Sequence, residues 1–452
     1  MNMKNGRNPD LTVSGFSKLP KSEKINWVAR HYFESADEVA GELRSFWQDD
    51  EAQKVIDGFS ENVISNFLLP YSVAPNFLIN GRTYCVPMVI EESSVVAAAS
   101  SAAKYWLSRG GFKAEILGVQ KVGQVHFLWH GSDAEILHQL MPQLRERLLA
   151  DSADITCNMR GRGGGVTGIE LRDFTEQEPG YFQLLVTFET CDSMGANFIN
   201  SVLEQFAESL PVFFAEQECL PAEARQAEVI MAILSNYTPE CLVRATVECP
   251  VAALGEFDGC MDPEDFAARF ARAIRIARID PYRATTHNKG IFNGIDAVVI
   301  ATANDFRAVE ACGHAYAARD GQYRSLSDCR VEDGMFRFWL DLPMAVGTVG
   351  GLTSLHPLAK RSLQLLGNPT AEELMQIIAC TGLAQNFGAV RSLVTTGIQY
   401  GHMKMHLTNI LNHLNASEPE AAATQAHFAN RPVSFTGVRA FLDGLRAGQQ
   451  VQ

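Results

Sequence analysis

Alternating apolar and polar positions recur in the middle third of the chain. A period of two predicts strands at residues 115–130, 168–174, 181–190 and 228–236. Apolar residues spaced three and four positions apart predict helices at residues 134–151 and 195–210. The predicted elements therefore follow one another in the order β-α-β-β-α-β.

That order is typical of a ferredoxin-like module. We expect residues 113–236 to form this module, inserted within a larger mixed α/β domain made of residues 1–112 and 237–395. The final segment, 396–452, is expected to be a separate helical unit. The predicted fold class is therefore α+β.

The flanking segments carry their own signals. Residues 20–58 predict helices, Asn80-Gly81 predicts a tight hairpin, and residues 91–112 predict a helix that ends at Gly110-Gly111. Glu91 and Glu92 are expected in the first turn of that helix, where the helix dipole favours anions.

In the second half, strands are predicted at 243–254, 296–303 and 336–344, and a helix at 263–280. Thr370 and Glu373 predict a capping box that opens a long helix. Beyond Gly401, an apolar stripe from Met403 to Leu414 predicts a last helix, and the polar residues 417–427 predict a flexible linker.

Composition narrows the class of protein. The chain has 452 residues, 46% hydrophobic and 20% charged, which is typical of a globular protein with two or three domains. Its net charge is −14 and it contains no block of Lys or Arg, so we expect neither a nucleic-acid nor a membrane partner. An anionic ligand needs local Arg, Lys and backbone donors.

Ten cysteines are scattered without a C-x-x-C pair, which indicates reduced thiols and no metal site. The first 16 residues, MNMKNGRNPDLTVSGF, contain no apolar core of a signal peptide, and no apolar run approaches a membrane span of ~20 residues. A cytoplasmic protein is expected.

Four stretches carry candidate chemistry: EESSVVAAA with Glu92, RATTHNKGIFNGID with Lys289, IATANDFRAVEA with Asp305 and GIQYGHM with His402. Each has a structural alternative. Glu92 could complement a helix dipole, Lys289 could lie in a solvated loop, Asp305 could cap a helix that follows a strand, and His402 could line a core. The density of polar residues around Lys289 favours function over a simple turn.

These stretches, together with ENVISNFLLPYSVAPNFLINGR, CDSMGANFIN and ATANDFRAVEACGHAYA, occur in one order from about residue 58 to about residue 406. In that order they resemble the signature segments of 3-hydroxy-3-methylglutaryl-coenzyme A reductases, in the soluble bacterial form called class II. The resemblance implies reduction of the thioester of hydroxymethylglutaryl-coenzyme A to mevalonate and coenzyme A by two NADH or NADPH, or the reverse reaction.

The resemblance also implies a role for each residue. Lys289 stabilises the developing oxyanion, Glu92 handles its proton, Asp305 tunes both, and His402 protonates the departing thiolate from a flap. Arg283 holds the distal carboxylate of the substrate. Further substrate contacts are expected from Ser94, Thr286, Asn293 and Asn236.

The cofactor is expected at the turn that leads into the helix at 195–210, on Asp192, Met194, Gly195, Ala196 and Asn197. Asp192 favours the free 2′-hydroxyl of NADH slightly. Residues 163–168, GGGVTG, match the dinucleotide fingerprint in form, but they lead into a predicted strand and not into a helix.

By resemblance the site forms between two subunits, which predicts a homodimer or a larger homo-oligomer. Two alternatives stay open, a Schiff-base lysine enzyme and a non-catalytic relative. The chain also departs from the pattern of the family at Ser65, Ser93, Ser193 and Ala303, where glycine, proline, alanine and glycine are expected.

Overall fold

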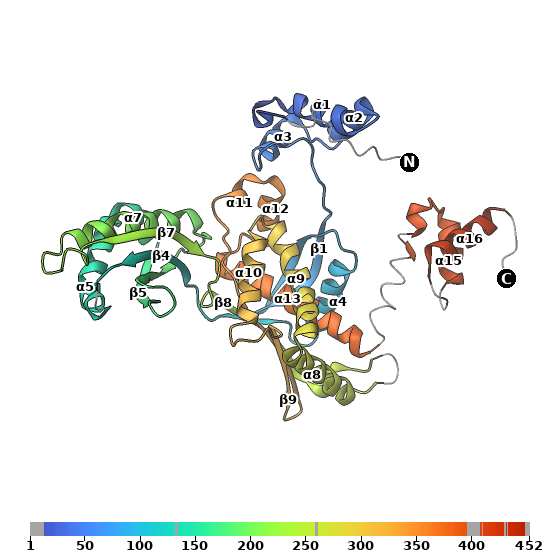
Figure 1. Ribbon diagram of the computed structural model, residues 1–452. Helices are drawn as coiled ribbons and strands as arrows, with labels where there is room; N and C mark the ends of the chain where they lie inside the picture. Colours follow the sequence, from blue (N-terminus) through green and yellow to red (C-terminus); the bar gives the residue numbers. More distant parts are fainter. Residues whose placement is uncertain are drawn as a thin grey trace.

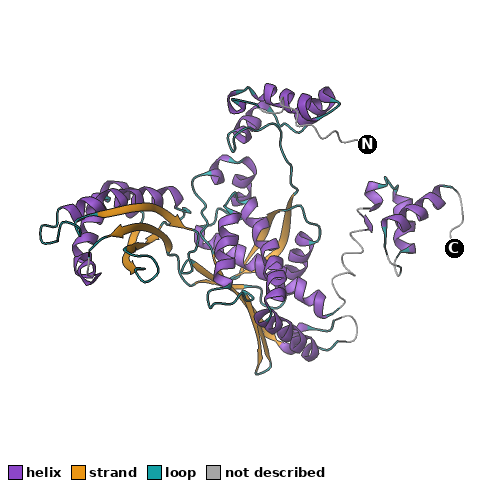
Figure 2. Ribbon diagram, viewed as in Figure 1, coloured by secondary structure: helices purple, strands orange, loops and turns teal. Residues whose placement is uncertain are grey.

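The computed structural model describes residues 13–131, 134–257, 261–395, 407–408, 410–428, 431 and 433–447. Figures 1 and 2 show a central body of helices around a sheet, with a second α/β unit to its left and small helical units above and to its right. The α+β class predicted from the sequence is confirmed.

The second unit contains the predicted β-α-β-β-α-β order. Its sheet has the strand order β5-β6-β4-β7, and every neighbouring pair is antiparallel. The strands are β4 (Lys121–Trp129), β5 (Gly165–Asp173), β6 (Tyr181–Glu189) and β7 (Ala227–Ser235), and the helices are α5 (Ala134–Asp151), α6 (Ala153–Arg160) and α7 (Ala196–Ala215). GGGVTG leads into β5, as expected, and so does not form a strand-to-helix phosphate loop.

The central body is built on a second antiparallel sheet with the order β3-β8-β10-β9. Its strands are β3 (Lys113–Ile116), β8 (Leu242–Pro250), β9 (Ser327–Glu332) and β10 (Met335–Pro343). Helix α13 (Ala371–Val394) runs through the middle, where it contacts α9, α4 and β8. It is long and apolar enough to span a membrane, but most of it is buried in this core.

The hairpin of β1 (Tyr71–Ile79) and β2 (Arg82–Val89) packs on α4 (Val95–Leu107). It turns at Asn80 and Gly81, whose φ angles of 48° and 83° suit the tight turn that was predicted. Helix α4 begins at Val95, so the prediction that Glu91 and Glu92 lie in its first turn is wrong. Both glutamates lie in the preceding turn, because the chain reaches the helix through Ser94 in a left-handed conformation.

The largest correction concerns the polar segment 283–296 and the apolar run 296–303. Both belong mostly to one helix, α9 (Pro281–Ala301), although a strand was predicted at 296–303 and a loop was the structural alternative for Lys289. Asp305 therefore follows a helix and a turn, not a strand. It caps α10 (Phe306–Ala317) through the backbone N–H groups of Arg307 and Ala308, which is the structural alternative stated above.

The remaining helices complete the body and the terminal units. Helix α8 (Pro263–Ile279) packs on α9, while α11 (Leu352–Leu355) and α12 (Pro357–Leu365) lead to the confirmed capping box of α13. The N-terminal unit contains α1 (Lys21–Tyr32), α2 (Ala36–Ser45) and α3 (Asp50–Asp57). The C-terminal unit contains α15 (Glu418–His427) and α16 (Phe435–Arg446).

The flexible linker predicted at residues 417–427 is wrong, because helix α15 occupies Glu418–His427. Ser417 and Glu420 form a capping box that starts α15. In the predicted apolar stripe, Leu407, Ile410 and Leu411 are buried in the core of the C-terminal unit, and Met403 lies outside the described residues.

Ala303, where glycine is expected from the family, has a φ of 54°. This left-handed conformation costs an alanine about 1–2 kcal/mol, and glycine avoids that cost while losing more entropy on folding. We expect Ala303→Gly to stabilise the protein by about 0.5–1 kcal/mol in urea unfolding. The matched change Ala301→Gly, in the last turn of α9, should destabilise it. Equal destabilisation by both changes would contradict the argument.

Candidate active site

Helix α9 carries most of the candidate substrate residues on one side. Its first turn is fixed by Pro281 and by the carboxylate of Asp280, which accepts hydrogen bonds from the backbone N–H groups of Tyr282 and Arg283. Arg283 and Lys289 are six residues apart, which corresponds to about 9 Å along the helix axis. The two cations therefore stand at opposite ends of a surface that a small chain molecule can span.

Lys289 and Glu92 meet in space although 197 residues separate them in the sequence. Lys289 Nζ lies 2.7 Å from Glu92 Oε2, and the Asn293 amide donates to the same oxygen at 3.3 Å. In the single chain the side chains of Glu92 and Lys289 are 40% and 61% exposed. The pair therefore lies at the mouth of a cleft and is not buried within this subunit.

The cleft has a volume of about 270 Å³. The predicted substrate residues that line it are Glu92, Ser94, Arg283, Thr286, Lys289 and Asn293. Within the part of the chain that the structure describes, the guanidinium of Arg283 has neither an acidic partner nor a hydrogen-bond acceptor. Burial lowers the pKa of this half-buried group, which means that its charge is poorly solvated. An anion in the cleft would satisfy it.

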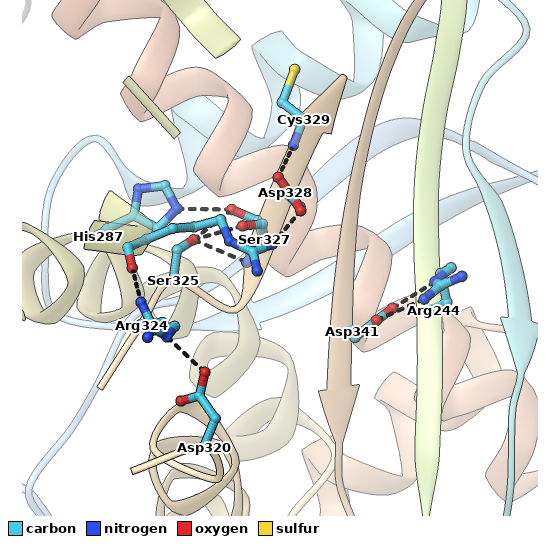
Figure 3. Close-up of polar contacts among 10 residues, drawn as sticks. Arg244, His287, Asp320, Arg324, Ser325, Ser327, Asp328, Cys329 and Asp341 are labelled. Carbon is cyan, nitrogen blue, oxygen red and sulfur yellow. Dashed lines mark hydrogen bonds and ion pairs between the residues drawn. The ribbon is translucent and has the colours of Figure 1, made fainter. Parts of the chain in front are cut away.

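His287 and Asn288 are buried residues that anchor α9 to the core, and His287 also lines the cleft. His287 Nε2 lies 2.8 Å from Ser327 Oγ, whose hydroxyl donates to Asn386 Oδ1 on α13, and Figure 3 shows the imidazole directed at Ser327. Asn288 exchanges two hydrogen bonds with the backbone of Arg324 and Leu326. These contacts fix the rotation of α9 and so the direction of Lys289.

The imidazole of His287 is neutral at physiological pH. Burial, and to a lesser degree the nearby charge of Arg283, lower its pKa to about 3. A proton relay near neutral pH is therefore not its role.

Ser94 is held in a strained backbone conformation beside the pair. Its φ is 77°, in the left-handed region that is costly for serine, and α4 begins directly after it without a side-chain cap. Ser94 and Val95 both line the cleft, so the uncapped N-terminus of α4 contributes backbone donors at the same place as Glu92.

Two of the predicted residues that the structure describes do not line this cleft. Asp305 pairs with Arg307, at 3.1 Å between Oδ1 and Nε, and the described chain places neither Glu92 nor Lys289 in contact with it. Asn236 lines a separate small cavity beside Met194 and Ala196. His402 lies outside the described residues. One chain thus brings Glu92 and Lys289 into contact, while the ion pair that Asp305 makes is with Arg307.

The predicted cofactor residues form a turn ahead of α7. Gly195 has a φ of 88°, and a Cβ there would lie 2.5 Å from Thr190 Cγ2, so the position requires glycine. The N-terminus of α7 has no side-chain cap, which leaves its first N–H groups for a ligand. These features fit the phosphates of a nicotinamide dinucleotide.

Asp192 in this turn already has a partner. Its Oδ1 accepts the backbone N–H of Ala371, at the start of α13, at 2.8 Å. The 347–349 loop lies against the other side of the turn, because the N–H groups of Thr348 and Val349 donate to the carbonyl of Asp192. Asp192 therefore connects the cofactor turn to the central body, which weakens the inference that its carboxylate selects NADH.

Two residues of the cleft were missed from the sequence. Gln385 and Asn386 lie on α13, are 6% and 2% exposed, and line the cleft. Gln385 Oε1 is buried without a hydrogen-bond partner in the described chain. Two adjacent amides within the apolar sequence of α13 were the available signal, because a buried helix seldom carries them without a polar partner.

Asp296 lies two turns beyond Lys289 on α9 and faces Glu310 of α10. Burial, and then the proximity of Glu310, raise the pKa of Asp296 to about 8 from 3.8. The folded protein thus keeps a proton that the unfolded chain releases above pH 4. This contribution to stability is complete below about pH 4 and is lost as pH rises towards 8.

We expect Asp296→Asn to remove most of that loss, because an amide stays neutral and can donate to Glu310 at every pH. At pH 8 the variant should be about 1–3 kcal/mol more stable than the parent protein, and at pH 5 the difference should be smaller. Urea unfolding at both pH values measures this. Glu42→Gln, at an exposed site on α2, is the control. If Asp296→Asn changed the free energy of unfolding by the same amount at both pH values, the raised pKa of Asp296 would be contradicted.

Comparison with known proteins identifies the family of the chain. Residues 22–407 match the family model for hydroxymethylglutaryl-coenzyme A reductase. The chain is 37% identical over 403 residues to a 3-hydroxy-3-methylglutaryl-coenzyme A reductase of Archaeoglobus fulgidus, covering 88% of this chain and 86% of the relative. It is 31% identical to a probable enzyme of the same name from Borreliella burgdorferi, covering 89% and 88%.

A solved structure is also similar. The class II 3-hydroxy-3-methylglutaryl-CoA reductase of Streptococcus pneumoniae, bound to NADPH in open conformations, superimposes with a TM-score of 0.70 at 37% identity. The match covers 85% of this chain and all of the other.

Proposed function

The chain belongs to the hydroxymethylglutaryl-coenzyme A reductase family, and from this premise we propose how its cleft performs the reaction of that family. The reaction is the reduction of hydroxymethylglutaryl-coenzyme A to mevalonate and coenzyme A. The observation that carries the assignment of residues is the 2.7 Å contact between Lys289 and Glu92, in a cleft that Arg283 also lines. Among the described residues, the Arg283 guanidinium has no acidic partner.

Lys289 and Glu92 suit the reacting end of the substrate. Reduction of a thioester carbonyl places negative charge on its oxygen, which the ammonium of Lys289 would stabilise. Glu92, fixed by Lys289 and Asn293, would hold or release the proton that this oxygen needs.

Arg283 suits the opposite end of the substrate. The hydroxymethylglutaryl group carries a free carboxylate, and a guanidinium binds carboxylates with two parallel hydrogen bonds. Thr286 and Ser94, which line the same cleft, would supply further donors. The distance of about 9 Å along α9 between Arg283 and Lys289 fits a five-carbon chain together with the reach of both side chains.

The cofactor is NADH or NADPH, which supplies hydride when bound. Met194, Gly195, Ala196 and Asn197 would hold its phosphates at the start of α7. The unit from β4 to β7 would form the cofactor domain, and the start predicted at residue 113 is corrected, because residues 113–116 form β3 and pair with β8 of the central sheet. The Streptococcus pneumoniae relative was solved with NADPH, and Asp192 is engaged by α13, so we propose no preference between the two.

We propose that the active unit is a homodimer. The Glu92–Lys289 pair is partly exposed in one chain, and Asp305 pairs with Arg307 and not with Lys289, so a second subunit could cover the pair and bring another acid to it. Phe67 and Leu68 in the ENVISNFLL segment are 92% and 60% exposed, an apolar surface that an interface would bury.

A cytoplasmic location is proposed as well. The described cysteines all carry free thiols, and α13 is a core helix of the fold.

The deciding experiment uses purified protein with hydroxymethylglutaryl-coenzyme A and either NADH or NADPH. Absorbance of the reduced nicotinamide and formation of mevalonate are followed, and light scattering gives the mass of the same sample. We expect two cofactor molecules to be oxidised for each mevalonate, by a dimer or a larger assembly. Folded, dimeric protein that oxidises neither cofactor would point to a non-catalytic relative.

A further inference from the structure

A buried lysine supports the cofactor turn from below. Lys121 is the first residue of β4 and is 4% exposed. Its ammonium donates to Thr190 Oγ1 at 2.5 Å and to the carbonyl of Ser193 at 3.2 Å. Thr190 in turn donates to the same carbonyl at 2.6 Å. One cation thus joins the two ends of the turn that precedes α7.

The charge of Lys121 has no counter-ion in the described chain. Both of its hydrogen-bond partners are neutral oxygens, and no described carboxylate lies within ion-pairing distance. A buried ammonium without an anion is costly, since it loses hydration without gaining an opposite charge. An ammonium carries three protons, and the structure gives acceptors to two of them.

A second positive feature points to the same place. The N-terminus of α7 carries the partial positive charge of the helix, and it has no side-chain cap. Lys121, Met194 and Ala196 line one small cavity at this helix end, together with Asn236. The ammonium of Lys121 and the positive end of α7 therefore lie at the same turn, and an anion bound on that turn would interact favourably with both.

We propose that Lys121 is a positioning residue for the cofactor. It holds the Thr190–Ser193 turn in the shape that presents the N–H groups of α7, and it adds a poorly screened positive charge below a phosphate of the dinucleotide. Lys121 stays beneath the turn and need not touch the substrate. This inference rests on the proposed function, because it assumes that the anion at α7 belongs to NADH or NADPH.

The test is Lys121→Met, a change that keeps most of the side-chain volume and removes the charge. We expect the KM for the nicotinamide cofactor to rise roughly 10- to 100-fold, as for the loss of a charged hydrogen bond. The kcat and the KM for hydroxymethylglutaryl-coenzyme A should change by less than about threefold. Inhibition by ADP in competition with the cofactor should weaken by the same factor as the KM rises.

Lys113→Met, on the exposed edge of the neighbouring sheet, is the matched control and should change none of these values. Lys121→Arg, which keeps a cation, should recover part of the affinity. If Lys121→Met does not fold, Thr190→Val tests the same turn, because it removes the central hydroxyl and leaves the charge in place. We expect that variant to raise the cofactor KM by a smaller factor.

The outcomes distinguish a cofactor-positioning role of Lys121 from a purely structural one. A lower melting temperature with an unchanged cofactor KM and ADP inhibition would reduce Lys121 to a structural role and overturn the proposal. An equal rise in KM for both substrates would overturn it as well. Absence of turnover in the parent protein would count against the proposed function, and direct titration with ADP would then still decide whether Lys121 supports anion binding.

Discussion

Replacing Lys289 with methionine should lower kcat by about 10³-fold or more while the KM for hydroxymethylglutaryl-coenzyme A changes little. Methionine fills a similar volume but provides no charge for the developing oxyanion. The effect on kcat should dominate because the charge on the carbonyl oxygen grows only as the thioester is reduced. Initial rates with saturating cofactor, over a range of substrate concentrations, separate the two constants.

Two further lysine variants serve as controls. Lys104→Met, at an exposed position of α4, should leave both constants unchanged. Lys289→Arg keeps a cation but changes its size and shape, so it should recover only part of the activity. A Lys289→Met variant that folds normally and keeps more than a tenth of the parent kcat would remove Lys289 from the reaction.

The elements that the sequence predicted correctly are those whose signals are local. The strands of the inserted unit alternate clearly because one face of their sheet is packed and the other is exposed. The hairpin at Asn80-Gly81 and the capping box at Thr370 and Glu373 depend on residues a few positions apart. Such features need no information from distant parts of the chain.

The sequence did not predict helix α9, because tertiary packing stabilises this helix more than the helix propensity of its residues does. The run from Ala297 to Ala301 is apolar and almost wholly buried, so it has no amphipathic period that would distinguish a helix from a strand. Gly294 lowers helix propensity, yet a Cβ there would lie 2.9 Å from the carbonyl oxygen of Thr381 on α13. The glycine allows two core helices to approach closely, which no local rule reveals.

The candidate site was predictable in its residues but not in its geometry. The meeting of Glu92 with Lys289 depends on the packing of the segment before α4 near α9, and only resemblance to a family connected them in advance. His287 and Asn288 were counted with the chemistry, and they proved to be buried anchors. Gln385 and Asn386 were missed because they lie on α13, outside the four stretches that carry candidate chemistry.

Replacing Arg283 should have the second large effect: it should weaken substrate binding without lowering the stability of the protein. We expect Arg283→Ala to raise the KM for hydroxymethylglutaryl-coenzyme A by about 100-fold, because the substrate carboxylate loses a charged, two-point partner. The kcat should fall much less, since the carboxylate is remote from the reacting carbon. Initial rates at substrate concentrations well above the parent KM measure both constants.

The same variant should be at least as stable as the parent protein. In the described chain, Arg283 is half-buried and its guanidinium makes no ion pair or hydrogen bond, so its removal breaks no polar contact and relieves the cost of a poorly solvated charge. Arg275→Ala, at an exposed position of α8, should change neither KM nor stability. A marked loss of stability in Arg283→Ala, without a change in KM, would show that the arginine holds the fold and not the substrate. The expected combination, weaker binding with equal or greater stability, is typical of a charge that is kept for a ligand.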